Sequence, residues 1–155
     1  MTRILFVCLG NICRSPAAEA ATRALCAKRG LDIAVDSAGT GDWHVGHPPH
    51  PPMIEAARRR GINLGPLRAR QIGQGDFGAF DLILGMDAAN LAAIERIRPR
   101  GIATPVRLFL ENAEVPDPYF DDSYDAALDL IETGAADLVA QLLAQTTSAK
   151  APKDW

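Results

Sequence analysis

The chain has 155 residues, 48% of them hydrophobic and 23% charged, and a net charge of -3. This balance predicts one globular domain with a sizeable core, and the weak acidity excludes a surface that recruits nucleic acid. Three cysteines are too few for a disulfide framework and the apolar run over residues 4–9 is too short for membrane insertion, so a cytoplasmic location is expected.

Apolar runs of strand length alternate with helical patterns along the chain. Residues 3–8 predict a strand buried on both faces, and Pro16 opens an alanine-rich helix that stops at Gly30. Further strands are expected near residues 33–37, 80–85 and 106–110, and further helices near 52–60, 88–97 and 123–143. The alternation predicts a doubly wound α/β domain over residues 1–145, followed by a tail, residues 146–155.

The loop after the first strand, Cys8-Leu9-Gly10-Asn11-Ile12-Cys13-Arg14-Ser15-Pro16, has the composition of a phosphate-binding nucleophile loop. A helix N-terminus and a nearby arginine favour the thiolate of Cys8, which is the attacking form. Backbone N–H groups of residues 9–14 can bind phosphate oxygens if the loop curls around the sulfur, and Gly10 permits that curl. Arg14 would bind two further oxygens, and Ser15 would donate its hydroxyl to the sulfur. The loop therefore predicts phosphate-ester hydrolysis through a cysteine.

Asp117 is the candidate proton donor, in the loop Val115-Pro116-Asp117-Pro118-Tyr119. The two prolines bias its backbone towards an extended conformation and so aim a short carboxyl side chain. A departing phenolate needs a general acid near neutral pH, because a phenol has a pKa of about 10. An ordinary Pro-Asp-Pro turn is the alternative interpretation.

The nucleophile loop resembles the active-site signature of the low-molecular-weight protein tyrosine phosphatases. Further strings follow in the family's order and approximate spacing: Asp36-Ser37-Ala38-Gly39-Thr40, Trp43-His44-Val45-Gly46, Arg68-Ala69-Arg70-Gln71-Ile72, residues 81–87 and residues 115–119. The resemblance implies a three-layer α/β/α fold with a four-stranded parallel sheet and the phosphate-binding loop between the first strand and the first helix. It also implies a phospho-cysteine intermediate, with no metal and no cofactor.

The resemblance further implies a role for each site residue. Asp117 acts as acid in the first step and as base in the second, while Ser37 and Asn11 brace the loop. The substrate is contacted by the loop and by flat apolar walls, namely Leu9, Gly10, Asn11, Ile12, Cys13, Ser15, Trp43 and Tyr119. The expected partner is a tyrosine-phosphorylated protein, for example a tyrosine kinase, and the expected state is a monomer or weak homodimer.

Some positions bear on regulation or depart from the family pattern. Cys13 could form a reversible disulfide with Cys8 under oxidation, which would protect the nucleophile. Leu67 stands where many relatives carry a histidine, so the polar network of that histidine is expected to be missing and Asp87 to lack its usual partner.

Other functions remain open on the same residues. Arginine phosphatases of this family carry threonine at the position of Ile12, so Ile12 favours phosphotyrosine. Arsenate reductases on this fold use additional cysteines beyond mid-chain, and none follows Cys26. A metallophosphatase would have to use His44, His47 and His50, which lie in a Pro/Gly-rich loop without helical spacing. A non-catalytic phosphopeptide-binding module would not need Cys8, Arg14 and Asp117 together.

Overall fold

The computed structural model describes residues 1–147. Their four strands form one parallel sheet in the order β2-β1-β3-β4. The strands are β1 (Thr2–Cys8), β2 (Ile33–Gly39), β3 (Leu82–Gly85) and β4 (Val106–Leu108). β1 pairs with β2 on one side, where Cys8 lies opposite Gly39, and with β3 on the other, where Val7 lies opposite Gly85. The nucleophile loop therefore leaves the centre of the sheet at its carboxyl edge.

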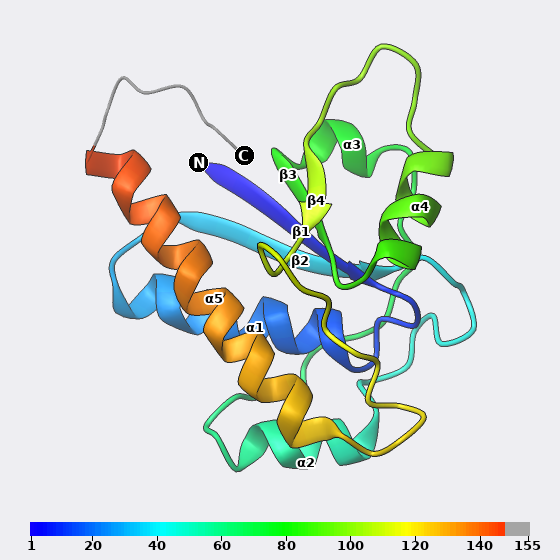
Figure 1. Ribbon diagram of the computed structural model, residues 1–155, viewed down its shortest axis with the longest axis vertical. Helices are drawn as coiled ribbons and strands as arrows, with labels where there is room; N and C mark the ends of the chain where they lie inside the picture. The colour runs from blue at the N-terminus through cyan, green and yellow to red at the C-terminus, as the bar shows by residue number, and fades with distance from the viewer. Residues whose placement is uncertain (148–155) are drawn as a thin grey trace.

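Helices cover both faces of the sheet (Figure 1). One face carries α1 (Arg14–Lys28), α2 (Pro51–Arg58) and α5 (Tyr124–Thr147), and the other carries α3 (Asp76–Ala79) and α4 (Ala88–Arg96). This arrangement confirms the predicted three-layer α/β/α class.

The core is divided between the two faces of β1. Ile4, Phe6 and Cys8 belong to the cluster under α1 and α5, whereas Leu5 and Val7 belong to the cluster on the opposite face. Successive side chains of a strand point to opposite faces, so a strand covered on both faces is apolar throughout. This explains the continuous apolar run near the N-terminus.

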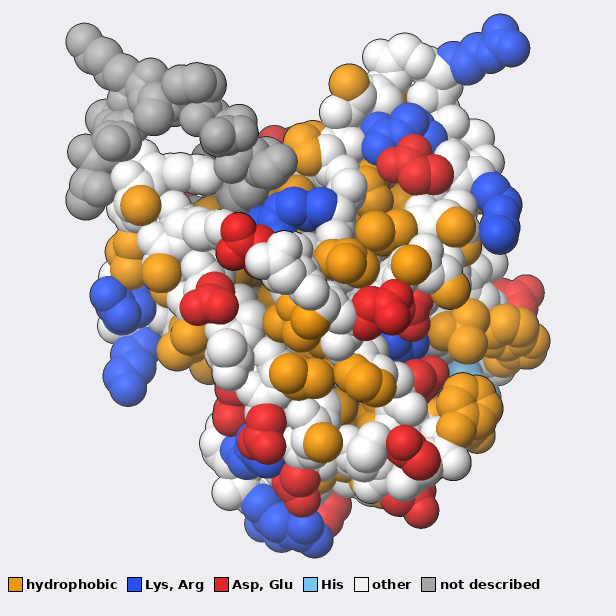
Figure 2. Space-filling model, viewed as in Figure 1, with side chains coloured by type: hydrophobic (Ala, Val, Ile, Leu, Met, Phe, Trp, Pro, Cys, Tyr) orange, Lys and Arg blue, Asp and Glu red, His pale blue; other side chains and the backbone are white. Residues whose placement is uncertain are grey.

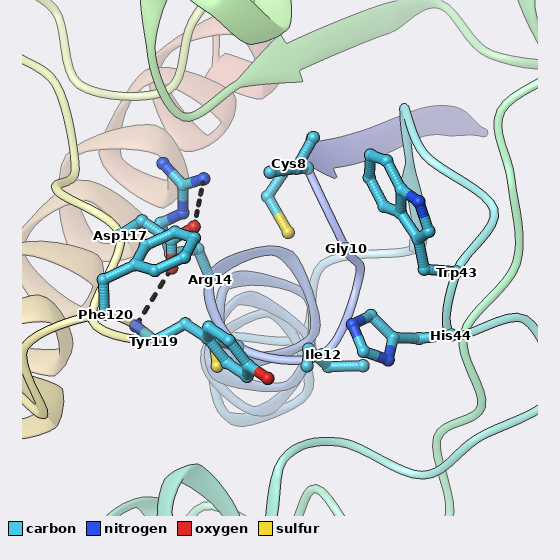
Figure 3. A pocket seen from close by; sticks show the side chains of 11 residues that line it. Cys8, Gly10, Ile12, Arg14, Trp43, His44, Asp117, Tyr119 and Phe120 are labelled. Carbon is cyan, nitrogen blue, oxygen red and sulfur yellow. Dashed lines mark hydrogen bonds and ion pairs between the residues drawn. The ribbon is translucent and has the colours of Figure 1, made fainter.

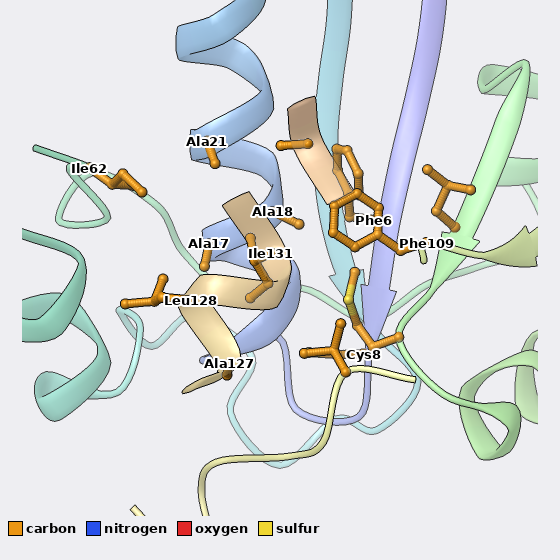
Figure 4. Close-up of a cluster of buried hydrophobic side chains, with 14 of the residues drawn as sticks. Phe6, Cys8, Ala17, Ala18, Ala21, Ile62, Phe109, Ala127, Leu128 and Ile131 are labelled. Atoms are coloured by element: carbon orange, nitrogen blue, oxygen red, sulfur yellow. The ribbon is translucent and has the colours of Figure 1, made fainter. Parts of the chain in front are cut away.

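Small residues let α5 pack closely against α1 (Figure 4). Ala17, Ala18 and Ala21 of α1 are at most 5% exposed and belong to the same cluster as Leu128 and Ile131 of α5. Beside them Phe6 meets Phe109 edge to face, with ring centroids 5.4 Å apart. The packing fixes α1, and with it the helix N-terminus that adjoins the nucleophile loop.

Some boundaries differ from the sequence-based expectation. α3 was not predicted, because four residues that include a glycine carry no helical periodicity. α5 continues to Thr147 rather than ending near residue 143, since the apolar pair Leu142 and Leu143 still packs against the core in its last turns. Residues 148–155 of the expected tail lie outside the described residues. Within residues 1–147, no helix is both long enough and apolar enough to cross a bilayer.

Candidate active site

The sulfur of Cys8 lies at the base of the loop that joins β1 to α1 (Figure 3). The backbone N–H of Asn11 donates to Cys8 Sγ at 3.3 Å, and Ser15 Oγ is 3.1 Å from the same sulfur. Cys13 occupies the N-cap of α1 without a side-chain cap bond, so the free N–H groups of the first turn adjoin the loop. These donors and the positive end of the helix dipole stabilise an anion at this place.

Backbone hydrogen bonds hold the loop in shape. Thr40 and Gly41 donate to the carbonyls of Cys8 and Leu9, each at 2.9 Å, and the N–H of His50 donates to the Ile12 carbonyl at 2.9 Å. The segment that follows β2 thus supports the loop from outside. Gly39 lies so close that a Cβ there would be 2.9 Å from the carbonyl oxygen of Leu9, and the approach therefore requires glycine.

Asn11 supports the loop from behind. Its φ of 56° is left-handed, a conformation that asparagine tolerates better than most residues. Its Nδ2 donates to Ser15 Oγ at 2.7 Å and to Ser37 Oγ at 2.9 Å, and its Oδ1 accepts from the Arg70 N–H at 3.0 Å. Because Ser15 Oγ accepts from Asn11, its own proton is available to donate to Cys8 Sγ.

Glu19 completes this network and was not anticipated from the sequence. Glu19 is 4% exposed and its carboxylate accepts from Ser37 Oγ at 2.7 Å, so Ser37 donates to Glu19 and accepts from Asn11. Arg23 binds the other carboxylate oxygen and so pairs the buried charge. The available signal was the spacing, because Glu19 follows Ser15 by one helical turn and shares its face of α1.

Arg14 is the anion-binding side chain. It is 2% exposed, and its Nη1 donates to Asp87 at 2.7 Å and to the Val115 carbonyl at 2.9 Å. Its Nη2 lies 3.4 Å from Asp117 Oδ2. Burial lowers the pKa of this guanidinium, but the charge of Cys8 and the two carboxylates raise it by more, so Arg14 stays cationic. Of its five N–H groups, Nε–H and one on Nη2 remain for two phosphate oxygens.

Asp87 has partners other than the histidine that Leu67 replaces. One carboxylate oxygen binds Arg14, and the other accepts from the Asn90 N–H at 2.8 Å and so caps α4. Leu67 packs against the hydrophobic cluster under α1. The polar role expected of a histidine at that position is thus replaced by apolar packing, and the loop is braced by Asn11, Ser37 and its backbone contacts instead.

A cavity of about 240 Å³ opens above the nucleophile. In Figure 3, Tyr119 and Phe120 form one wall, and Trp43 and His44 form the other. Asp117 lies beside Arg14, and its Oδ1 accepts from the Tyr119 N–H at 3.1 Å, which orients the carboxyl. The predicted residues that line the cavity are Cys8, Leu9, Gly10, Ile12, Cys13, Arg14, Trp43, Asp117 and Tyr119.

Three predicted residues do not line the cavity: the side chains of Asn11, Ser15 and Ser37 lie behind the loop and bond to one another. Conversely, His44 lines it but was considered from the sequence only as a metal ligand. Its position next to Trp43 in a Pro/Gly-rich loop was the available signal.

Large apolar side chains surround the mouth of the cavity. Trp43 is 66% exposed and Phe120 77%, and Leu9 and Tyr119 are also exposed. Orange side chains gather beside a pale blue histidine at the right-hand edge of the face in Figure 2. Exposed aromatic groups of this kind mark a binding surface.

The histidines of the Pro/Gly-rich loop make other contacts. His50 Nε2 is 3.1 Å from the Tyr124 hydroxyl, and the His50 ring lies 5.0 Å from that of Tyr119. Among residues 1–147, no three His, Cys, Asp or Glu side chains are grouped so as to hold a metal ion.

Comparison with known proteins identifies the family. A family profile described as low molecular weight phosphotyrosine protein phosphatase matches residues 3–148. The chain belongs to this family. YfkJ of Bacillus subtilis (strain 168), named a low molecular weight protein-tyrosine-phosphatase, is 42% identical over 92% of this chain and 96% of that protein. The low molecular weight phosphotyrosine protein phosphatase of Schizosaccharomyces pombe is 45% identical over 78% of this chain and 83% of that protein.

Solved structures agree with this assignment. The crystal structure of YfkJ superposes with a TM-score of 0.86 and covers 94% of this chain and 96% of that one. Vibrio vulnificus Wzb, solved in complex with benzylphosphonate, is 27% identical, has a TM-score of 0.81, and covers 90% of this chain and 98% of that one. The enzyme is thus a protein tyrosine phosphatase, a hydrolase of phosphotyrosine proteins, and its family works through a cysteine nucleophile.

Proposed function

We propose that this enzyme hydrolyses protein phosphotyrosine and small aryl phosphates with Cys8 as nucleophile, Arg14 as phosphate ligand and Asp117 as general acid and base. The observation that carries the proposal is the convergence of these three side chains on one cavity, at the junction of β1 and α1. Cys8 and Arg14 come from one loop, but Asp117 joins them from a position 103 residues beyond Arg14, so the meeting of all three is not a by-product of local sequence.

In the first step the thiolate of Cys8 attacks phosphorus while Asp117 donates its proton to the phenolic oxygen that leaves. The loop N–H groups and Arg14 bind the equatorial oxygens, and their bonds strengthen as the phosphoryl group becomes trigonal. The products are a phospho-cysteine and a neutral phenol. Asp117 lies beside Arg14, and this supports a position of its carboxyl next to the phosphate that Arg14 would hold.

In the second step the carboxylate of Asp117 takes a proton from water, which attacks phosphorus and displaces Cys8 as thiolate. The Ser15 hydroxyl, 3.1 Å from the sulfur, stabilises the departing thiolate by donating to it. The step regenerates the thiolate and protonated Asp117, and inorganic phosphate leaves.

The walls of the cavity support an aryl substrate. Tyr119 and Phe120 face Trp43 across the opening, so a phenyl ring can lie between flat apolar surfaces while its phosphate reaches the loop. The benzylphosphonate bound by the Vibrio vulnificus relative is a ligand of this shape. Ile12 lines the same cavity and, as an apolar side chain, favours phosphotyrosine over phosphoarginine.

Redox control of the nucleophile is part of the proposal. Cys8 and Cys13 are both free thiols that line one cavity. Hydrogen peroxide would oxidise Cys8 to a sulfenic acid, and Cys13 would then displace water to give a disulfide that a cellular thiol can reduce. A peptide that links both cysteines after peroxide treatment, absent from Cys13→Ser, is the expected mass-spectrometric result.

The cellular setting completes the proposal. A reducing cytoplasm would keep these thiols active, and the phosphoprotein substrates would include a tyrosine kinase. We infer one catalytic domain over residues 1–145, with residues 146–155 dispensable for turnover, acting as a monomer or weak homodimer. Trapping of phosphoproteins from a lysate on Asp117→Ala tests the substrate, and sedimentation tests the assembly.

The catalytic assignment is tested with p-nitrophenyl phosphate and a phosphotyrosine peptide. Cys8→Ser should abolish turnover of both substrates, and Asp117→Ala should slow peptide hydrolysis by about two to four orders of magnitude. Circular dichroism controls for folding. If wild type and both variants showed the same negligible turnover, the assignment of these residues as catalytic would be refuted.

A further inference from the structure

A second hollow adjoins the catalytic cavity on the side of α4. This α4 groove, of about 550 Å³, is lined by Thr40, Gly41, Ala89, Ala93 and Arg96, and it shares Leu9, Trp43, Asp117 and Phe120 with the catalytic cavity. The small side chains of Ala89 and Ala93 leave its floor open. Because the same residues line both hollows, the hollows are adjacent, and a molecule held at the nucleophile loop can extend from one into the other.

Arg96 supplies the unpaired charge of the α4 groove. Arg14, Asp87 and Asp117 also line it, but their charges are engaged with one another, since the single guanidinium pairs with both carboxylates at 2.7 Å and 3.4 Å. Arg96 is exposed and makes no ion pair within residues 1–147. Its neighbour Glu95 is bound by Arg98 through two hydrogen bonds and does not neutralise it.

The geometry sets the reach of an occupant. α4 runs from Ala88 to Arg96, which spans about 12 Å at a rise of about 1.5 Å per residue. An extended peptide advances about 3.3 Å per residue, so this length corresponds to about four residues. The flank of a phosphotyrosine peptide, anchored by its phosphate beside Arg14, thus has the length to reach Arg96.

Resting on the function proposed above, we propose that the α4 groove binds the peptide flanking the phosphotyrosine and that Arg96 selects an Asp or Glu side chain in that flank. The inner end of the groove, next to the paired carboxylates Asp87 and Asp117, suits small or neutral residues. Its outer end carries an uncompensated cation. Arg96 therefore determines specificity and takes no part in the chemical steps.

The test uses phosphotyrosine peptides with a Ser/Gly background and a single Glu, or a single Lys, at successive positions up to about four residues on either side. The variants are Arg96→Ala and Arg96→Glu. Arg100→Ala and Arg100→Glu are the matched controls, because Arg100 is exposed and lies outside the α4 groove. These substitutions change the net charge by the same amount as those at Arg96. p-Nitrophenyl phosphate has no flank and reports the chemistry alone.

At one or more positions, wild type should prefer the Glu peptide over the neutral one by about three- to five-fold in kcat/KM, as for an exposed ion pair. Arg96→Ala should lose this preference, Arg96→Glu should prefer the Lys peptide, and the Arg100 variants should behave as wild type. Turnover of p-nitrophenyl phosphate should stay constant. A wild type without charge preference, or a preference that survives Arg96→Glu, would overturn the role of Arg96.

Failure of the two proposals can be told apart. If wild type hydrolyses the neutral phosphotyrosine peptide but ignores flank charge, only the α4 groove proposal fails. If it hydrolyses p-nitrophenyl phosphate and no phosphotyrosine peptide, the proposed function fails and the selection by Arg96 fails with it.

Discussion

Replacing Asn11 by alanine should destabilise the protein and slow turnover together, because Asn11 holds the loop around the nucleophile. The change removes three side-chain hydrogen bonds, to Ser15, Ser37 and the Arg70 N–H. At about 0.5–1.5 kcal/mol each, these bonds contribute about 2–4 kcal/mol. Alanine at the left-handed φ of 56° adds about 1 kcal/mol.

The total of about 3–5 kcal/mol should lower Tm by about 10 °C or more in a chain of this length. Glycine at the same position loses the same bonds but accepts the left-handed backbone, so Asn11→Gly should be about 1 kcal/mol more stable than Asn11→Ala. Urea unfolding of both variants measures the two contributions separately. With the loop N–H groups displaced, kcat should fall by about 100-fold in each.

Asn112→Ala is the matched control, because Asn112 is exposed and surface changes usually stay within about 0.5 kcal/mol. Equal unfolding midpoints for the alanine and glycine variants would refute the backbone contribution. Variants as stable as wild type would refute the reasoning from hydrogen bonds.

Three further results are expected. Asp117→Ala should lose more activity as the pKa of the leaving phenol rises, measured over a series of substituted phenyl phosphates; a uniform loss would argue against proton donation. Burial and then the charge of the nucleophile raise the pKa of the Cys13 thiol, so it stays protonated near neutral pH. Iodoacetamide should therefore alkylate the nucleophile and spare Cys13, as mass spectrometry would show; equal labelling of both would contradict this. A Cβ on Gly41 would lie 2.0 Å from the Trp43 ring, so Gly41→Ala must displace the indole and should raise KM for a phosphotyrosine peptide several-fold. Gly73→Ala, with nothing within 4 Å, is its control, and an unchanged KM in Gly41→Ala would exclude Trp43 from binding.

The elements that carry strong periodic signals were predictable. Burial on both faces accounts for the apolar run of β1, and helix propensity accounts for the alanine pattern of α1. The sequence predicts the ends of both elements to within two residues. α3 has no such signal because its helix is a single turn of four residues that includes a glycine.

The candidate site was predictable where its residues are local and less so where they are distant. The nucleophile loop is one continuous string, and Asp117 has two prolines beside it. Glu19 looks in the sequence like a solvated charge on an exposed helix face, yet the structure buries it against Ser37. Asp87 reaches Arg14 across 73 positions of sequence, a pairing that only the neighbouring ends of β1 and β3 bring about.

The burial of Arg14 has a consequence for product release. Asp87 and the Val115 carbonyl already hold its guanidinium in one orientation. The rotamer entropy of such a side chain, up to about 2 kcal/mol, is therefore lost during folding and not when an anion binds. This preorganisation does not distinguish the ester from the free anion. Inorganic phosphate meets the same rigid site as the substrate, and it should act as a competitive inhibitor whose departure limits turnover when phosphate accumulates.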